Sequence, residues 1–314
     1  MSICWYIVAV KGRRHKMNQP LKHHYLPVFY LRRWVGEDGR LVRYHRPPGR
    51  PDGKVVTSRV SPDYTGFGEQ LYTLHGASAP QMIETDFFSP VDNAAAPILD
   101  HLIAHGPASL DKTQRWYLAR FVHSLQLRGP HSLTEINAFV ERNLRENIER
   151  LDGPAYLATK QEGDPDSVFD DLLEHSPDEI ANTGKMFLPG LIEHEFIIQL
   201  IINMRWEVMD LSAATCTLLT ADRPYTTSHG FCDHSCVLTV PLSPIHLFTA
   251  ANDIGQLQKI AAQKADDTVR DANKLMTELA VQNVYGSTDS HLEFIEQRLR
   301  RHTEPPVPGL ITRD

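Results

Sequence analysis

Apolar residues recur along much of the chain at the three- and four-residue spacing of a helix face. The clearest run has positions i, i+3, i+4 and i+7 filled by Leu118, Phe121, Val122 and Leu125. Asp111 is the expected N-cap of this helix, and Gly129-Pro130 its expected stop. Arg128 continues the apolar face, so it needs an anion. The partner is either a carboxylate of a neighbouring helix or the anionic group of a substrate.

Residues 178 to 203 carry the strongest apolar signal, and their final part is apolar on nearly every side. A helix of this kind is typically buried, so we predict a central helix covered by a sheet formed by residues 206 to 250. His194 and Glu195 interrupt the apolar run, and we expect them to be a satisfied buried polar pair.

Alternating and β-branched runs predict strands in two places. Near the N-terminus the candidate strands are 40–46, 54–60 and 69–74. After the apolar helix, four strands are expected to pair with one another: 206–210, 216–220, 237–242 and 246–250. A long helix at 256–283 and a terminal helix at 290–302 follow. We predict an α+β protein, predominantly helical with small antiparallel sheets.

This pattern indicates a single domain from residue 17 to residue 302. Its three parts are a basic N-terminal hairpin region (22–75), a helical body (84–203) and a mixed β/α region (206–302). We interpret residues 1–16 as an N-terminal extension, and either Met1 or Met17 is the true start. Residues 303–314 are expected to be a tail.

The composition is that of an ordinary globular protein, with 41% hydrophobic and 23% charged residues among 314. The apolar start, Met1 to Val10, precedes its basic cluster and lacks a small-residue cleavage site, so it is a poor signal peptide. It is also about half as long as a bilayer span. We expect a cytoplasmic protein of bacterial type with no membrane contact.

Charge is unevenly distributed. Residues 1–59 contain thirteen Lys or Arg and three Asp or Glu. Since the whole chain has 32 basic and 39 acidic residues, residues 60–314 contain 19 basic and 36 acidic residues. The basic segment either docks on the acidic body or attracts an anionic partner such as a phosphate or a nucleic acid. A pI near 6.1 argues against a protein dedicated to coating DNA.

Four cysteines in a chain of this size do not form a disulfide framework. Four residues of the types that bind zinc lie within one eight-residue segment: His229, Cys232, His234 and Cys236. Structural zinc sites usually need a second, distant pair of ligands. The segment is therefore either a weak zinc candidate or a surface loop.

The densest group of reactive side chains is His23-His24 with the aromatic and basic segment that follows. Pro27 suits the first turn of a helix, which would place the imidazoles at its N-terminus. Asp222 follows a predicted strand and precedes Arg223-Pro224, the kind of position where catalytic carboxylates are often presented.

Several separated segments form an ordered set: residues 23–34, Ile83-Glu84 with Asp92, Phe121 to Arg128 with Gly129-Pro130, residues 220–224, residues 241–244, and Asn273 with Val284-Tyr285. Together these segments resemble the bacterial family that carries domain of unknown function 4238. The resemblance covers roughly residues 18 to 290 and supports Met17 as the start. The chain departs from the family pattern at Asp92, Ala221 and Arg223, where Glu, Ser and Asn are usual. The family has no established activity.

The joint occurrence of these residues in the family signature motivates one candidate site. We predict His24, His23, Asp222 and Glu84 as catalytic residues, and Arg128, Tyr25, Tyr30 and Arg32 as substrate-binding residues. Imidazoles and carboxylates can hold a divalent metal or exchange protons, and arginine can neutralise a phosphate. Because adjacent residues of an extended chain point to opposite sides, only one imidazole can face a given pocket, and we predict His24.

Two functions from different classes remain. One is a hydrolase-like enzyme, of phosphodiesterase or nuclease type, that acts on a phosphate-bearing or nucleic-acid substrate. The other is a non-catalytic binding or regulatory module with an anionic partner. Signature residues gathered around an open cleft favour the enzyme, whereas the same residues buried and mutually satisfied favour the module.

Overall fold

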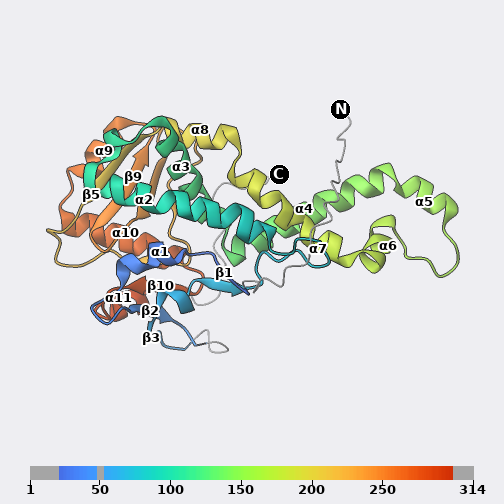
Figure 1. The fold of residues 1–314 in the computed structure, drawn as a ribbon, viewed down its shortest axis with the longest axis horizontal. Coiled ribbons are helices and arrows are strands. Elements are labelled where there is room, and N and C mark those ends of the chain that lie inside the picture. Colours follow the sequence, from blue (N-terminus) through green and yellow to red (C-terminus); the bar gives the residue numbers. More distant parts are fainter. Residues whose placement is uncertain (1–20, 48–52, 300–314) are drawn as a thin grey trace.

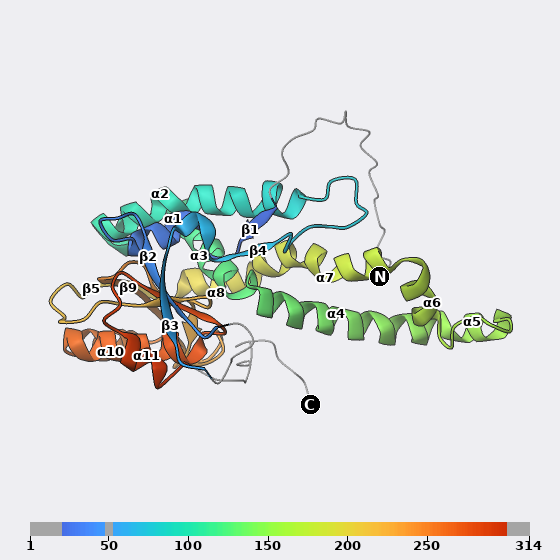
Figure 2. The same cartoon turned by 90° about the horizontal axis from the view of Figure 1, so that it is seen from below.

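The computed structural model describes residues 21–47 and 53–299. Its helices and short strands form one body from which a helical arm projects (Figures 1 and 2). The N-terminal elements are β1 (Lys22–His24), α1 (Val28–Leu31), the short 3-10 helix η1 (Arg32–Trp34), β2 (Leu41–His45), β3 (Val56–Val60), the 3-10 helix η2 (Pro62–Tyr64) and β4 (Phe67–Glu69). The predicted extension 1–16, Met17 and the tail 303–314 lie outside the described residues.

Helices fill the middle of the chain. They are the π-helical turn η3 (Ile83–Phe88), α2 (Ser89–His105), the 3-10 turn η4 (Pro107–Ser109), α3 (Lys112–Leu127), α4 (Pro130–Leu151), α5 (Gly153–Thr159), α6 (Val168–His175), α7 (Pro177–Ile192) and α8 (Glu195–Asn203). Asp111 caps α3 as predicted, because its side chain accepts the amide hydrogen of Gln114 and the Gln114 side chain accepts the amide hydrogen of Asp111. In Figure 2, α4 and α7 run side by side along the arm, and α5 and α6 form its tip.

The C-terminal elements form one four-stranded sheet and complete the other. They are β5 (Arg205–Asp210), β6 (Thr220–Ala221), β7 (Thr226–Thr227), β8 (Val237–Pro241), β9 (His246–Ala251), α9 (Ile254–Ala261), α10 (Ala265–Leu279), β10 (Asn283–Gly286) and α11 (Leu292–Glu296). The strand orders are β1-β4, β3-β2-β10-β6 and β5-β9-β8-β7, with antiparallel pairing throughout. The predicted fold class, α+β with small antiparallel sheets, is confirmed.

Sheet membership differs from the prediction in two places. The strand that we expected at 216–220 is reduced to β6, which pairs with β10 and not with its expected partners. The expected strand at 69–74 is also absent, since only Phe67–Glu69 pairs, and it does so with β1. A period-two pattern cannot identify the partner strand, because strands far apart in the sequence compete for the same edge.

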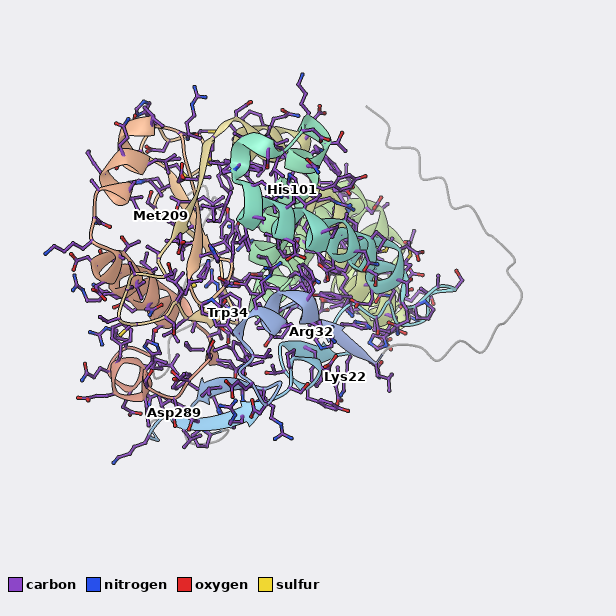
Figure 3. The ribbon with its side chains drawn as sticks, turned by 60° about the vertical axis from the view of Figure 1, so that its left-hand side comes forward. Lys22, Arg32, Trp34, His101, Met209 and Asp289 are labelled. Atoms are coloured by element: carbon purple, nitrogen blue, oxygen red, sulfur yellow. The ribbon has the colours of Figure 1, made fainter. Side chains whose placement is uncertain are left out.

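The N-terminal segment is joined to the rest of the body by buried polar bonds. The Tyr30 hydroxyl donates to the Pro241 carbonyl at 2.7 Å, and Trp34 Nε1 donates to the Leu218 carbonyl at 3.0 Å. Trp34, labelled in Figure 3, is fully buried between these parts of the chain. One large apolar cluster accordingly runs from Tyr25 to Tyr285.

The predicted central buried helix is wrong. The chain breaks after Ile192, so α7 and α8 are separate helices, and both contribute exposed apolar side chains: Met186, Phe187 and Phe196 are 58%, 50% and 57% exposed. His194 and Glu195 are exposed as well. Packing covers only part of this segment because α7 belongs to the projecting arm, where few elements are near.

The same segment has a second property. By length and composition, Pro177–Asn203 is the one helical segment among residues 21–47 and 53–299 that reaches the size and apolarity of a membrane span. Its apolar 18-residue window has a mean hydropathy of 1.2, and 22% of that window is buried.

Candidate functional site

The two adjacent histidines lie on β1 and not at a helix N-terminus, so their side chains point to opposite sides of the strand. His23 is fully buried and stacks on the Tyr72 ring, with the ring centroids 5.5 Å apart. Its Nδ1 accepts the Tyr72 amide hydrogen at 2.8 Å, and its Nε2 lies 2.6 Å from Gln81 Oε1, an acceptor. This pattern requires a neutral ring protonated at Nε2.

His24 is half-buried and has a different environment. Its ring packs obliquely against Phe67, and its buried Nε2 has no hydrogen-bond partner among residues 21–47 and 53–299. Burial lowers the pKa of His24; Asp63 opposes that shift, and Arg128 adds to it. Of the two imidazoles, His24 therefore retains an uncommitted nitrogen and is favoured in its neutral form.

Arg128 ends α3 with its side chain in the interior, where it is 1% exposed. Nη1 and Nη2 donate to the two Asp92 carboxylate oxygens at 2.7 and 3.0 Å, and Nη2 also donates to the His24 carbonyl at 2.9 Å. The guanidinium also lies 4.5 Å from the Phe88 ring centroid. Burial by itself lowers the pKa of Arg128, but Asp92 outweighs it and raises the pKa above its usual value. Arg128 thus has the neighbouring-helix carboxylate that is the first of its two predicted partners.

Glu84 lies beside this ion pair on the π-helical turn that leads into α2. Its Oε2 is buried, and no group in the described part of the chain forms a hydrogen bond with it. Burial raises the pKa of Glu84 to about 7; Arg128 opposes this shift, and Asp92 adds to it. Glu84 is therefore a carboxyl group that exchanges its proton near neutral pH, and π-helical turns are frequent at functional sites.

Asp222 lies at the end of β6, as predicted, but its carboxylate faces backbone amides. Oδ1 accepts the Val281 amide hydrogen at 2.8 Å, and Oδ2 accepts those of Gln282 and Asn283 at 2.7 and 2.8 Å. Burial raises the pKa of Asp222, and these three bonds counteract part of the shift. The side chain thereby fixes the connection between α10 and β10.

Tyr30 and Arg32, which we also predicted to bind substrate, lie apart from the residues described above. Tyr30 is fully buried, and its hydroxyl lies 2.8 Å from Thr220 Oγ1. Arg32 is exposed and lies 3.6 Å from Asp63; Figure 3 shows it on the same outer segment as Lys22. Other basic residues of the N-terminal segment form ion pairs with acidic residues of the remaining chain. Arg33 lies 2.6 Å from Asp100, and Arg46 lies 3.4 Å from Glu296.

A cavity of about 200 Å³ opens where Tyr25, the start of α4 and the β6 end meet. We call it the Tyr25 cavity, and its polar lining includes Tyr25, Gln126, His131, Ser132, Asp222 and Arg223. Of the predicted site residues, only Tyr25 and Asp222 line it. Gln126, His131 and Ser132 escaped the sequence analysis, although the Gly129-Pro130 helix start beside them was recognised.

The electrostatics of the Tyr25 cavity favour negative charge. α4 begins at Pro130, which has no amide hydrogen, and the first intrahelical bond runs from the Leu133 amide to the Gly129 carbonyl. The residues of α4 that line the cavity therefore form the N-terminus of the helix, which is the positive end of its dipole. Arg223 adds a full positive charge to the lining. Asp222 opposes it, but its oxygens already accept three amide hydrogens. Burial raises the pKa of Tyr25, so its hydroxyl is neutral.

The candidate zinc segment does not assemble a metal-binding group. Cys236 is buried, and its thiol donates to the His229 carbonyl at 3.2 Å, whereas Cys232 and His234 are exposed. Across residues 21–47 and 53–299, no three His, Cys, Asp or Glu side chains are arranged to hold a metal ion.

Comparison with known proteins identifies one relationship. A family model described as "Protein of unknown function (DUF4238)" matches residues 22–290. No curated protein and no solved structure matches the chain.

Proposed function

Because the chain belongs to the DUF4238 family, whose function is unknown, we propose its function from the site alone: it binds a small anionic group in the Tyr25 cavity and acts as a binding or regulatory module. The observation that supports this proposal is that Arg223 and the positive end of α4 line the same space. Anion binding at helix N-termini has this physical basis, and arginine supplies matching donors.

The size of the cavity restricts the ligand. Pockets that bind drug-sized ligands have volumes of roughly 300 to 1,000 Å³. The Tyr25 cavity has a volume of about 200 Å³. A phosphate or carboxylate group fits this volume, whereas a whole nucleotide does not. The group is therefore either a free small anion or the end of a larger molecule that extends into solvent.

The binding proposal also accords with the state of the predicted catalytic residues. His23 uses both ring nitrogens, Arg128 is paired with Asp92, and Asp222 accepts three amide hydrogens. Groups already committed to the fold are poorly placed to exchange partners during a reaction.

Calorimetric titration with inorganic phosphate tests the proposal, with acetate as the alternative anion. We expect Arg223→Gln to weaken phosphate binding by about tenfold, as loss of a charge-assisted hydrogen bond implies. Arg120→Gln is the matched control, because Arg120 is also 9% exposed but pairs with Glu193 outside the cavity. Equal affinity in the two variants, or no binding to the natural chain, would refute the proposal.

A hydrolase-like function is the second candidate, and Glu84 favours it. Its carboxyl combines a pKa of about 7 with an oxygen that has no hydrogen-bond partner among the described residues. A general acid or base works best with such a pKa. The assay is hydrolysis of a chromogenic phosphodiester as a function of pH. Loss of activity in Glu84→Gln, with retention in Asp86→Asn on the same turn, supports it; activity unchanged in Glu84→Gln excludes it.

A further inference from the structure

A second and larger cavity lies at the end of the body away from the arm. It holds about 430 Å³ between η4, the start of α3, the start of β5 and α9. Figure 1 shows α3, β5 and α9 gathered at this end of the molecule. We call it the Arg115 groove, and the residues of its lining that matter here are Arg115, Met204, Trp206, Glu207, Ile254 and Leu257.

Arg115 is held in a fixed position in this groove. Its guanidinium carbon lies 3.8 Å from the centroid of the Trp206 ring. Nη2 donates to the carbonyls of Ile202 and Met204 at 2.9 and 3.4 Å. Nε and Nη1 of Arg115 form no hydrogen bond with the described residues. Neither of them is a buried atom that lacks a partner, so both are reached by solvent. They are consequently available to a ligand in the groove.

The charge of Arg115 has no partner among the described residues. Each of the buried guanidiniums of Arg46, Arg120 and Arg128 has a carboxylate within 4.0 Å, and no such ion pair involves Arg115. Burial lowers the pKa of Arg115, and no acidic side chain counteracts that shift. A partly buried cation without a counter-ion is costly, so the groove favours an incoming anion.

The rest of the lining is apolar on one side. Met204, Trp206 and Leu257 are buried against the groove, and Ile254 at its rim is 53% exposed. Arg205 and Glu207 also line the groove, and their charges cancel. With the charge of Arg115, the groove therefore has one net positive charge. A single negative charge therefore balances the groove, whereas a phosphate dianion would leave an excess beside Glu207.

We propose that the Arg115 groove is a binding site for a small amphipathic carboxylate. The carboxylate accepts hydrogen bonds from the guanidinium of Arg115, whose planar fork matches it, and the hydrocarbon part packs against Ile254 and Leu257. The volume of about 430 Å³ falls within the range of small-molecule sites. This site is independent of the Tyr25 cavity.

Calorimetric titration of the full chain with phenylbutyrate tests the proposal, and the uncharged phenylbutanol is the matched probe. We expect phenylbutyrate to bind and phenylbutanol to bind about tenfold more weakly, the cost of losing the charged contact. No binding of phenylbutyrate, or equal affinity of the acid and the alcohol, overturns it.

Substitutions then locate the bound molecule. Ile254→Asp places a negative charge at an exposed position of the rim and should weaken phenylbutyrate binding by about tenfold or more without affecting the fold. Leu275→Asp on α10, where the side chain is 43% exposed, is the control and should bind as the natural chain does. Arg115→Met should abolish the preference for the acid over the alcohol. Full affinity in Ile254→Asp overturns the assignment whether or not Arg115→Met folds.

Discussion

Two arginines distinguish two regions of this molecule. Arg128, between α2 and α3, has a bidentate carboxylate partner, a carbonyl acceptor and an aromatic face. Arg115, in the groove at the other end of α3, has an aromatic face and two carbonyl acceptors but no carboxylate partner among residues 21–47 and 53–299. The first region satisfies its own charges and stabilises the fold, and the second leaves a charge for something outside the chain. A signature residue is thus not necessarily the residue that is free to bind.

The largest effect is expected when the satisfied region loses one partner. Arg128→Met should lower the free energy of unfolding by about 3 to 5 kcal/mol, because it leaves the Asp92 carboxylate in the interior without its cation. Chemical denaturation measures it. Arg33→Gln is the control, since Asp100 is largely exposed and the pair should contribute less than about 1 kcal/mol. Comparable losses in both variants would contradict the distinction between the regions.

The histidine pair repeats the comparison on adjacent residues. His23→Ala should cost about 3 kcal/mol, because it leaves a cavity and removes the acceptor of the buried Tyr72 amide. His24→Ala should cost about 1 kcal/mol or less, because Nε2 of His24 has no partner to lose. Thermal melts of the two variants provide the measurement. A greater loss for His24→Ala would mean that the roles of the two side chains are reversed.

Glu84 gives a pH-dependent form of the same comparison. Its pKa in the folded chain, about 7, exceeds the ordinary value of 4.5, so the folded state binds more protons between these values and stability falls as pH rises through that window. Glu84→Gln removes the penalty. The variant should match the natural chain at about pH 4 and exceed its stability by about 2 kcal/mol at about pH 8. A stability difference that does not change with pH would show that the pKa of Glu84 is the same in the folded and the unfolded chain.

A small change in stability, comparable to that of His24→Ala, is expected at Arg115. Arg115→Met keeps an apolar stem against Trp206 and loses the cation–π contact and the hydrogen bonds to two carbonyls, so it should cost about 1 kcal/mol. Denaturation in the absence of ligand measures this cost. A loss as large as that of Arg128→Met would indicate that Arg115 is a structural residue like Arg128.

Much of the local structure followed from short-range chemistry. The cap at Asp111, the stop at Gly129-Pro130 and the α3 face around Phe121 depend on neighbours within a few residues, and they were predictable. The environment of residues 177–203 was not. Their apolar composition predicted a covered helix, but its coverage depends on distant elements, and the arm places few of them near α7.

The candidate site divides in the same way. Local sequence and the family resemblance selected Arg128, Asp222, Glu84 and the His pair, because residue types and order are properties of the chain itself. Only the tertiary structure decided that Asp92 neutralises Arg128 and that the amides of residues 281–283 donate to Asp222. It likewise decided that Arg115 has no anionic partner in the described part of the chain. The physical reason is that charge compensation acts over a few ångströms in space, and these partners lie tens of residues apart in the sequence.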